Sequence, residues 1–324
     1  MKFNLDSFIG TKVLIIGDAM IDSYYRGKVD RISPEAPVPI VSVMGNESRL
    51  GGAANVALNI QSLGGIPILC AMCGLDDQGK KLRSLLLEAN MAGKGILSMD
   101  HRPTTVKTRI IAGNQQLLRV DQEDSSDLDK KSVDYVIKHT LALLIEEEPD
   151  VVIFEDYDKG FISKRLIQKV VSACNERNIP TVVDPKKRNF MAYKGVTLFK
   201  PNLKELVEGL KVEVDRFDLP RLNSACDVLR DSLGASKILL TLSENGVLLS
   251  SEKEKRHILA HVRNIADVSG AGDTVISIAA LALANKFTDL QIANLANLGG
   301  GLVCEKVGVV PIDLESLKLE AEKH

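Results

Sequence analysis

The stretch Val268-Ser269-Gly270-Ala271-Gly272-Asp273-Thr274, followed by an apolar run from Val275 to Ala284, decides how the chain is interpreted. Apolar residues recur at helical spacing in that run, so we predict a helix that begins at the glycine turn. Gly270 and Gly272 leave backbone N–H groups open to close approach, and a helix N-terminus favours an anion. Asp273 stands beside this anion hole, as a general base would during phosphoryl transfer to a hydroxyl. The same turn also fits a simple aspartate N-cap on a buried helix, and the turn alone does not decide between the two.

Composition indicates a globular protein without a nucleic-acid or membrane partner. The chain has 324 residues, of which 45% are apolar, and 41 basic residues stand against 43 acidic ones. With no basic excess, we expect no binding to nucleic acid or to an anionic membrane. The apolar runs at 13–16 and 275–284 are too short for a signal peptide or a membrane span. Five cysteines, an odd number, favour reduced thiols and a cytoplasmic location, and we interpret Cys70 and Cys73 as buried strand residues.

Strand–helix alternation predicts an α/β fold with a mostly parallel sheet and helices on both faces. No long linker or repeat divides the chain, so we expect one domain over residues 1–324. Polar clusters fall just after predicted strands, where ligands bind in α/β folds. These clusters are Asp18 with Asp22, Asp156, Asp184 with Lys186, and Asn202 with Glu205. They predict one cleft along the carboxyl edge of the sheet.

Two segments, about 20–45 and 104–122, predict a small β-sheet lid over that cleft. Prolines at 34, 37 and 39 exclude a helix and a central strand. Gly113-Asn114 lies between two alternating runs, which is a hairpin signal. Lys107, Arg109 and Arg119 put three cations on this hairpin, and they are either solvated strand faces or contacts to a substrate phosphate. We interpret the acidic stretch 121–134 as a solvated loop and helix start.

A resemblance to a known family rests on motifs spread over nearly the whole chain. Gly51-Gly52 with Asn55, and the turn that contains Asp273, resemble the two signatures of the ribokinase-like (PfkB) sugar kinases. The run Arg31 to Val41 resembles, more specifically, the members that act on a heptose 7-phosphate. This resemblance implies an ATP-dependent kinase that phosphorylates the anomeric hydroxyl of D-glycero-β-D-manno-heptose 7-phosphate, for the synthesis of ADP-heptose and the lipopolysaccharide core. The bifunctional form carries a C-terminal nucleotidyltransferase domain, and because the sequence ends at His324 we expect the kinase acting alone.

The resemblance also implies roles for matched positions. Asp273 would be the catalytic base, and Gly270, Ala271 and Gly272 would form the anion hole. Sugar hydroxyls would be held by Asp22, Gly51, Gly52 and Asn55. The ATP and Mg²⁺ side would comprise Lys186, Asn202, Glu205, Ser243, Gly246, Gly272 and Asn297. Asp267 and Ser269 fall where many relatives bind a monovalent cation such as K⁺. Lys107, Arg109 and Arg119 would recognise the substrate phosphate, to which Lys186 is a further candidate.

The resemblance further implies a homodimer that pairs its lids. Other functions stay open at this point: a kinase of another sugar phosphate of the fructose 1-phosphate type, or a non-catalytic sugar or nucleotide sensor on the same fold. A dinucleotide-binding dehydrogenase is disfavoured, because no GxGxxG follows the first strand.

Overall fold

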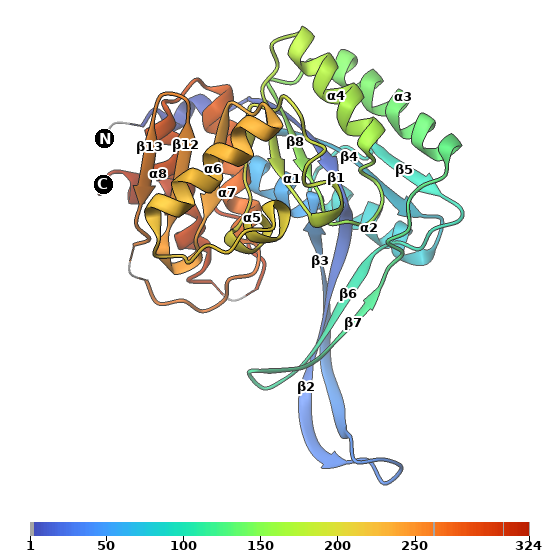
Figure 1. Ribbon diagram of the computed structural model, residues 1–324. Helices are drawn as coiled ribbons and strands as arrows, with labels where there is room; N and C mark the ends of the chain where they lie inside the picture. Colours follow the sequence, from blue (N-terminus) through green and yellow to red (C-terminus); the bar gives the residue numbers. More distant parts are fainter. Residues whose placement is uncertain (1–2, 262, 307, 324) are drawn as a thin grey trace.

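A computed structural model describes residues 3–261, 263–306 and 308–323. The predicted single domain of 1–324 therefore has positions 1–2, 262, 307 and 324 outside the described residues. Its body is a nine-stranded sheet covered by helices, and a second, four-stranded sheet projects from it as an arm (Figure 1). Within the described part of the chain, no helix is long and apolar enough to cross a membrane.

The large sheet has the strand order β13-β12-β11-β10-β9-β8-β1-β4-β5. Neighbouring strands are parallel except at one edge, where β12 pairs antiparallel with both β11 and β13. The mostly parallel α/β sheet predicted from the sequence is confirmed. The strands of this sheet are β1 (Lys12–Gly17), β4 (Ile66–Gly74), β5 (Ile96–Met99), β8 (Val151–Glu155), β9 (Thr181–Asp184), β10 (Leu198–Phe199), β11 (Lys237–Thr241), β12 (Val247–Ser251) and β13 (Lys255–Ile258).

Alternate residues of β1 show why helices cover both faces. Val13 and Ile15 belong to one buried apolar cluster, and Leu14 and Ile16 belong to the other. Because successive side chains of a strand point to opposite faces, a continuous apolar run needs cover on both. The first cluster is covered by α1 (Ala53–Ser62), α2 (Asp77–Glu88), α7 (Ala271–Ala284), α8 (Asp289–Val303) and α9 (Leu314–Ala321). The second is covered by α3 (Lys130–Glu147), α4 (Lys164–Glu176), α5 (Leu203–Leu210) and α6 (Leu219–Leu233).

The four-stranded sheet, which we call the lid, has the order β3-β2-β6-β7. Its strands are β2 (Ala19–Ile32), β3 (Pro39–Gly52), β6 (Val106–Ala112) and β7 (Gln115–Gln122). β3 is an edge strand that begins at Pro39, as the prolines predicted. The pairing of β2 with β6 ends at Gly27 and Ala112, so the outer part of β2 and β3 continues as a two-stranded ribbon (Figure 1).

Candidate active site

The glycine turn forms the N-terminus of α7, as predicted. Gly270 is the N-cap residue and has a φ of 81°, a left-handed conformation that favours glycine. The N–H of Ala271 donates to the Val268 carbonyl at 3.3 Å. The backbone N–H groups of Gly272 and Asp273 have no such backbone acceptor among the described residues. They are therefore free to donate to an anion at the positive end of the helix dipole. Of the residues predicted for the anion hole, Gly272 therefore keeps a free N–H group, as does Asp273, whereas the N–H of Ala271 is already engaged.

Asp273 is a buried carboxylate held by two donors from distant parts of the chain. The Asn55 side chain, in the first turn of α1, donates from Nδ2 to Oδ2 at 2.6 Å. The hydroxyl of Tyr157, just after β8, donates to Oδ1 at 2.9 Å. Burial raises the pKa of Asp273 to about 6 against the lowering effect of these donors. A carboxylate in that range can accept a proton from a substrate hydroxyl near neutral pH.

Carboxylates and ammonium groups from neighbouring strand ends lie near Asp273. Lys200, directly after β10, pairs with Asp184 at the end of β9 over 2.8 Å, and both side chains are buried. Glu155 ends β8 beside them, and its Oε2 has no hydrogen-bond partner among the described residues. Burial and the nearby charges of Asp184 and Asp273 raise the pKa of Glu155 well above its usual value. A Cβ at Gly272 would lie 3.6 Å from Asp184 Oδ2 and 3.7 Å from Lys200 Nζ, so the glycine turn lies against this cluster.

The predicted sugar side lies where the lid joins the body. Gly51 and Gly52 end β3 and pair with the start of β2. A Cβ at Gly51 would fall 2.2 Å from Asp22 Oδ2, and one at Gly52 would fall 2.4 Å from the Asp18 carbonyl. Only glycine fits this close approach. The structure therefore brings Asp22 against Gly51, and Asn55 against Asp273.

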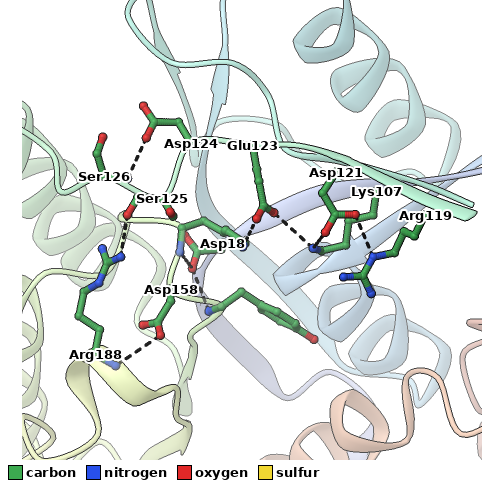
Figure 2. Close-up of polar contacts among 12 residues, drawn as sticks. Asp18, Lys107, Arg119, Asp121, Glu123, Asp124, Ser125, Ser126, Asp158 and Arg188 are labelled. Atoms are coloured by element: carbon green, nitrogen blue, oxygen red, sulfur yellow. Dashed lines mark hydrogen bonds and ion pairs between the residues drawn. The ribbon is translucent and has the colours of Figure 1, made fainter.

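The three lid cations have carboxylate partners. Arg109 forms an ion pair with Asp22. Lys107 lies between Asp121 at 3.2 Å and Glu123 at 3.3 Å, and Arg119 contacts Asp121 at 2.9 Å (Figure 2). The interpretation of residues 121–134 as a solvated loop was wrong at its start, because Asp121 belongs to β7 and Glu123 follows it.

A second set of cations surrounds the buried ring of Tyr24 on the same sheet. The guanidinium carbons of Arg109, Arg49 and Arg26 lie 5.3, 5.4 and 5.7 Å from its centre. Arg49 also donates to the Val309 carbonyl, which ties the lid to the segment beside Gly270. Neither Arg26 nor Arg49 was predicted as a site residue, and nothing in their spacing distinguishes them from solvated strand residues.

The residues expected on the nucleotide side have local structural partners. Asn202 and Glu205 form a capping box at the start of α5, a helix that the sequence analysis did not predict. Lys186 contacts Glu205 at 2.7 Å, which joins the ends of β9 and β10. Ser243 and Gly246 both have positive φ in the turn from β11 to β12, and Asn297 donates to the Leu259 carbonyl at 2.9 Å.

Asp267 and Ser269 tie the glycine turn to a neighbouring segment. The Asp267 carboxylate accepts from the N–H of Ser269 and from that of Gly308, each at 2.9 Å. These bonds lower the pKa of Asp267 despite its partial burial. Among the described residues, no group of three or more His, Cys, Asp or Glu side chains has a metal-binding arrangement.

Comparison with known proteins assigns the chain to one family. A profile described as "pfkB family carbohydrate kinase" matches residues 10–316. The chain belongs to this family, and it is therefore an ATP-dependent carbohydrate kinase. The family resemblance drawn from Gly51-Gly52 and the Asp273 turn is confirmed.

The chain is also similar, over almost its whole length, to longer proteins. The bifunctional protein HldE of Desulfatibacillum aliphaticivorans is 37% identical over 322 residues, which is 99% of this chain and 65% of that protein. The bifunctional protein HldE of Magnetococcus marinus is 39% identical over 316 residues, or 96% and 64% respectively. The chain thus spans less than two thirds of the length of these two relatives.

Solved structures share the fold at low sequence identity. Phosphofructokinase-2 from Escherichia coli, crystallised in complex with potassium, superposes with a TM-score of 0.81 at 18% identity, covering 97% of this chain and 99% of that one. Ribokinase from Arabidopsis thaliana, complexed with ribose and ATP, gives 0.72 at 16% identity and covers 96% and 98%. The fold is therefore ribokinase-like.

Proposed function

We propose that the chain transfers the γ-phosphoryl group of ATP to the anomeric hydroxyl of D-glycero-β-D-manno-heptose 7-phosphate, giving the 1,7-bisphosphate that feeds ADP-heptose and lipopolysaccharide core synthesis. The run Arg31 to Val41 and the similarity to HldE proteins support this substrate. The observation that carries the reaction type is the position of Asp273. It is a buried carboxylate at the open N-terminus of α7, with sugar-side Asn55 on one oxygen.

In this mechanism Asp273 accepts the proton of the anomeric hydroxyl as its oxygen attacks the γ-phosphorus. The free N–H groups of Gly272 and Asp273, with the dipole of α7, stabilise charge on the transferring group. Asp22 and Asn55 orient the sugar, and Arg109 fixes Asp22 by its ion pair. Lys107 and Arg119 balance the phosphate that the sugar already carries. Such a reaction needs positioning and charge stabilisation and little covalent chemistry.

Mg²⁺ arrives with ATP as part of the substrate, and Glu205 is the residue that would face it. Its carboxylate is fixed by Lys186 and by the N–H of Asn202, and oxygen donors of this kind suit Mg²⁺ through a water shell. A monovalent cation such as K⁺ would lie by Asp267 and Ser269, whose oxygens are hard donors beside the anion hole. When bound there, it would add positive charge to the N-terminus of α7.

We also propose a cytoplasmic homodimer that pairs its lids. The lid exposes several apolar side chains, which are Val29, Ile32, Val38, Val43, Met44, Leu118 and Val120. A thin sheet cannot bury such a surface by itself, whereas a second copy can.

A coupled assay of ADP release with a panel of sugars tests the function. Heptose 7-phosphate should give a kcat/KM at least about tenfold above that for fructose 1-phosphate, fructose 6-phosphate and ribose, because tenfold corresponds to only about 1.4 kcal/mol of differential binding. Preference for a fructose phosphate would replace the heptose proposal by the second kinase function. Binding of ATP and sugar without turnover on any of the panel would favour the sensor.

A further inference from the structure

Tyr157 contacts Asp273 directly, although the family resemblance implied no role for it. It lies directly after β8, and its hydroxyl donates to Oδ1 of Asp273 at 2.9 Å. We propose that Tyr157 is a positioning residue for the catalytic base: its hydroxyl fixes the Asp273 carboxylate and stabilises its ionised form. This inference rests on the proposed function only in that Asp273 is the base.

The loop that carries Tyr157 is held by a separate buried carboxylate. Asp18 accepts the backbone N–H of Tyr157 at 2.9 Å, of Lys159 at 3.1 Å and of Phe161 at 3.3 Å. The Lys186 ammonium lies 5.5 Å from the centre of the Tyr157 ring on the nucleotide side. Tyr157 is therefore held both by its backbone and by its ring, and its hydroxyl is kept within hydrogen-bond distance of Asp273.

The charges around the base explain why a fixed donor is needed. Glu155 from the end of β8 and Asp184 from the end of β9 face Asp273, and Lys200 and Lys186 oppose them. Asn55 is the second donor to Asp273, but it is also a proposed sugar ligand. Tyr157 is therefore the donor to Asp273 that has no proposed role in binding the sugar. Burial and the surrounding carboxylates raise the pKa of Tyr157 well above its usual value, so that it stays protonated and acts as a donor.

The test compares Tyr157→Phe with Tyr193→Phe. Tyr193 is a matched control, because it is a buried tyrosine whose hydroxyl donates at 2.7 Å to another strand-end carboxylate, Asp156. For each variant, kcat/KM for the sugar phosphate is measured from pH 5 to pH 9, with KM for ATP and the melting temperature beside it. The acid limb of this profile reports the base in the free enzyme.

We expect Tyr157→Phe to move the acid limb upward by about one pH unit, which is a tenfold loss of kcat/KM below the limb. Removing a donor to the ionised carboxylate raises the pKa of Asp273, so the variant needs a higher pH to ionise it. The loss should shrink toward pH 8, and KM for ATP should stay unchanged. Tyr193→Phe should leave the limb in place even where it lowers the melting temperature.

An unmoved limb in Tyr157→Phe, or an equal loss at every pH, would overturn the positioning role. An Asp273→Asn variant measured in parallel separates this failure from that of the base assignment. If Asp273→Asn retains turnover, the proposed mechanism itself is wrong. If it is inactive and Tyr157→Phe is unshifted, only the inference on Tyr157 fails. If Tyr157→Phe does not fold, 3-fluorotyrosine at position 157 keeps the ring and makes the hydroxyl a stronger donor. It should then move the acid limb of the kcat/KM profile to lower pH. An acid limb that does not move to lower pH would also overturn the positioning role.

Discussion

Replacing Arg109 tests how the lid recognises the sugar. Arg109 lies on β6 beside Tyr24 of β2, and its guanidinium pairs with Asp22, the carboxylate proposed to hold sugar hydroxyls. The side chains of Arg109 and Asp22 are only 18% and 7% exposed, so water can replace little of this contact. We predict that Arg109→Met raises KM for the sugar phosphate strongly while KM for ATP stays within about twofold, a change of less than about 0.5 kcal/mol.

The magnitude follows from the loss of a charge-assisted contact in a nearly dry site. Hydrogen bonds to charged groups contribute about 1.5–3 kcal/mol, which corresponds to a rise in KM of about 13- to 160-fold. Because Arg109 acts on Asp22 in this structure, the same loss should appear with an unphosphorylated sugar. A guanidinium that contacted the substrate phosphate instead would affect only the phosphorylated ligand.

The assay combines steady-state kinetics with calorimetric binding of the heptose with and without its 7-phosphate. Arg119→Met is the control, because Arg119 is half exposed and pairs with Asp121 rather than with a sugar ligand. Because Arg119 is a candidate for the substrate phosphate, Arg119→Met should weaken binding of the 7-phosphate but leave binding of the unphosphorylated heptose unchanged. Equal rises in KM for sugar and ATP in Arg109→Met would show that Arg109 is merely structural. A loss confined to the phosphorylated sugar would assign Arg109 to the phosphate.

Three further outcomes follow from the buried carboxylates. Asp273→Asn should keep the fold and ATP binding but lower kcat by about 10²–10⁴-fold, the usual range for a general base, and near-normal turnover would refute the assignment. Because burial raises the pKa of Asp273 to about 6, kcat/KM should fall about tenfold per unit as the pH drops below that value; a profile that is flat to pH 5 would contradict this. Asp18→Ala leaves three backbone N–H groups without their acceptor, and it should lower the free energy of unfolding in urea by about 3 kcal/mol or more, whereas Asp30→Ala on the exposed arm should change it by less than about 0.5 kcal/mol.

The sequence predicted those parts of the fold whose periodicity is strong. The apolar run of β1 and the alternation of strands and helices specified the parallel sheet, and the prolines placed β3 at an edge. The elements that were missed are short: β5 has four residues, and α5 and α9 have eight each. For α5 a signal was present, because Asn202 and Glu205 have the spacing of a capping box. Their interpretation as ligand residues alone leaves this helix signal unused.

The candidate site was predictable only where one local motif contains it. The glycine turn placed Asp273 at a helix N-terminus, but the partners of Asp273 come from 218 and 116 residues away. No spacing rule connects Asn55 or Tyr157 to that turn, since their approach depends on how the end of β8 and the N-termini of α1 and α7 meet. The pairing of the lid cations was missed for a related reason. Lys107 and Asp121 become neighbours only through the register of β6 and β7.

The apolar surface of the lid leads to the last prediction, which concerns assembly. Beyond Gly27, β2 and β3 form a ribbon of two strands without a third, and such a ribbon is marginally stable in water unless something covers it. Val38 and Val43 on this ribbon are about half exposed, and Ile40 and Val41 between them are partly buried. We therefore expect a dimer at micromolar concentration in light scattering.

Val43→Glu combined with Leu118→Glu should dissociate this dimer, because each change places a carboxylate on the surface that the partner lid would bury. A monomeric variant should also lose more affinity for the sugar phosphate than for ATP. The lid carries Arg109 and Tyr24, which lie on the proposed sugar side, while the proposed nucleotide residues lie on the body. Leu319→Glu is the control, because Leu319 is even more exposed than Val43 and Leu118 but lies on α9, outside the lid. A wild-type chain that is monomeric and fully active at micromolar concentration would refute the lid dimer, and so would a double variant that remains dimeric.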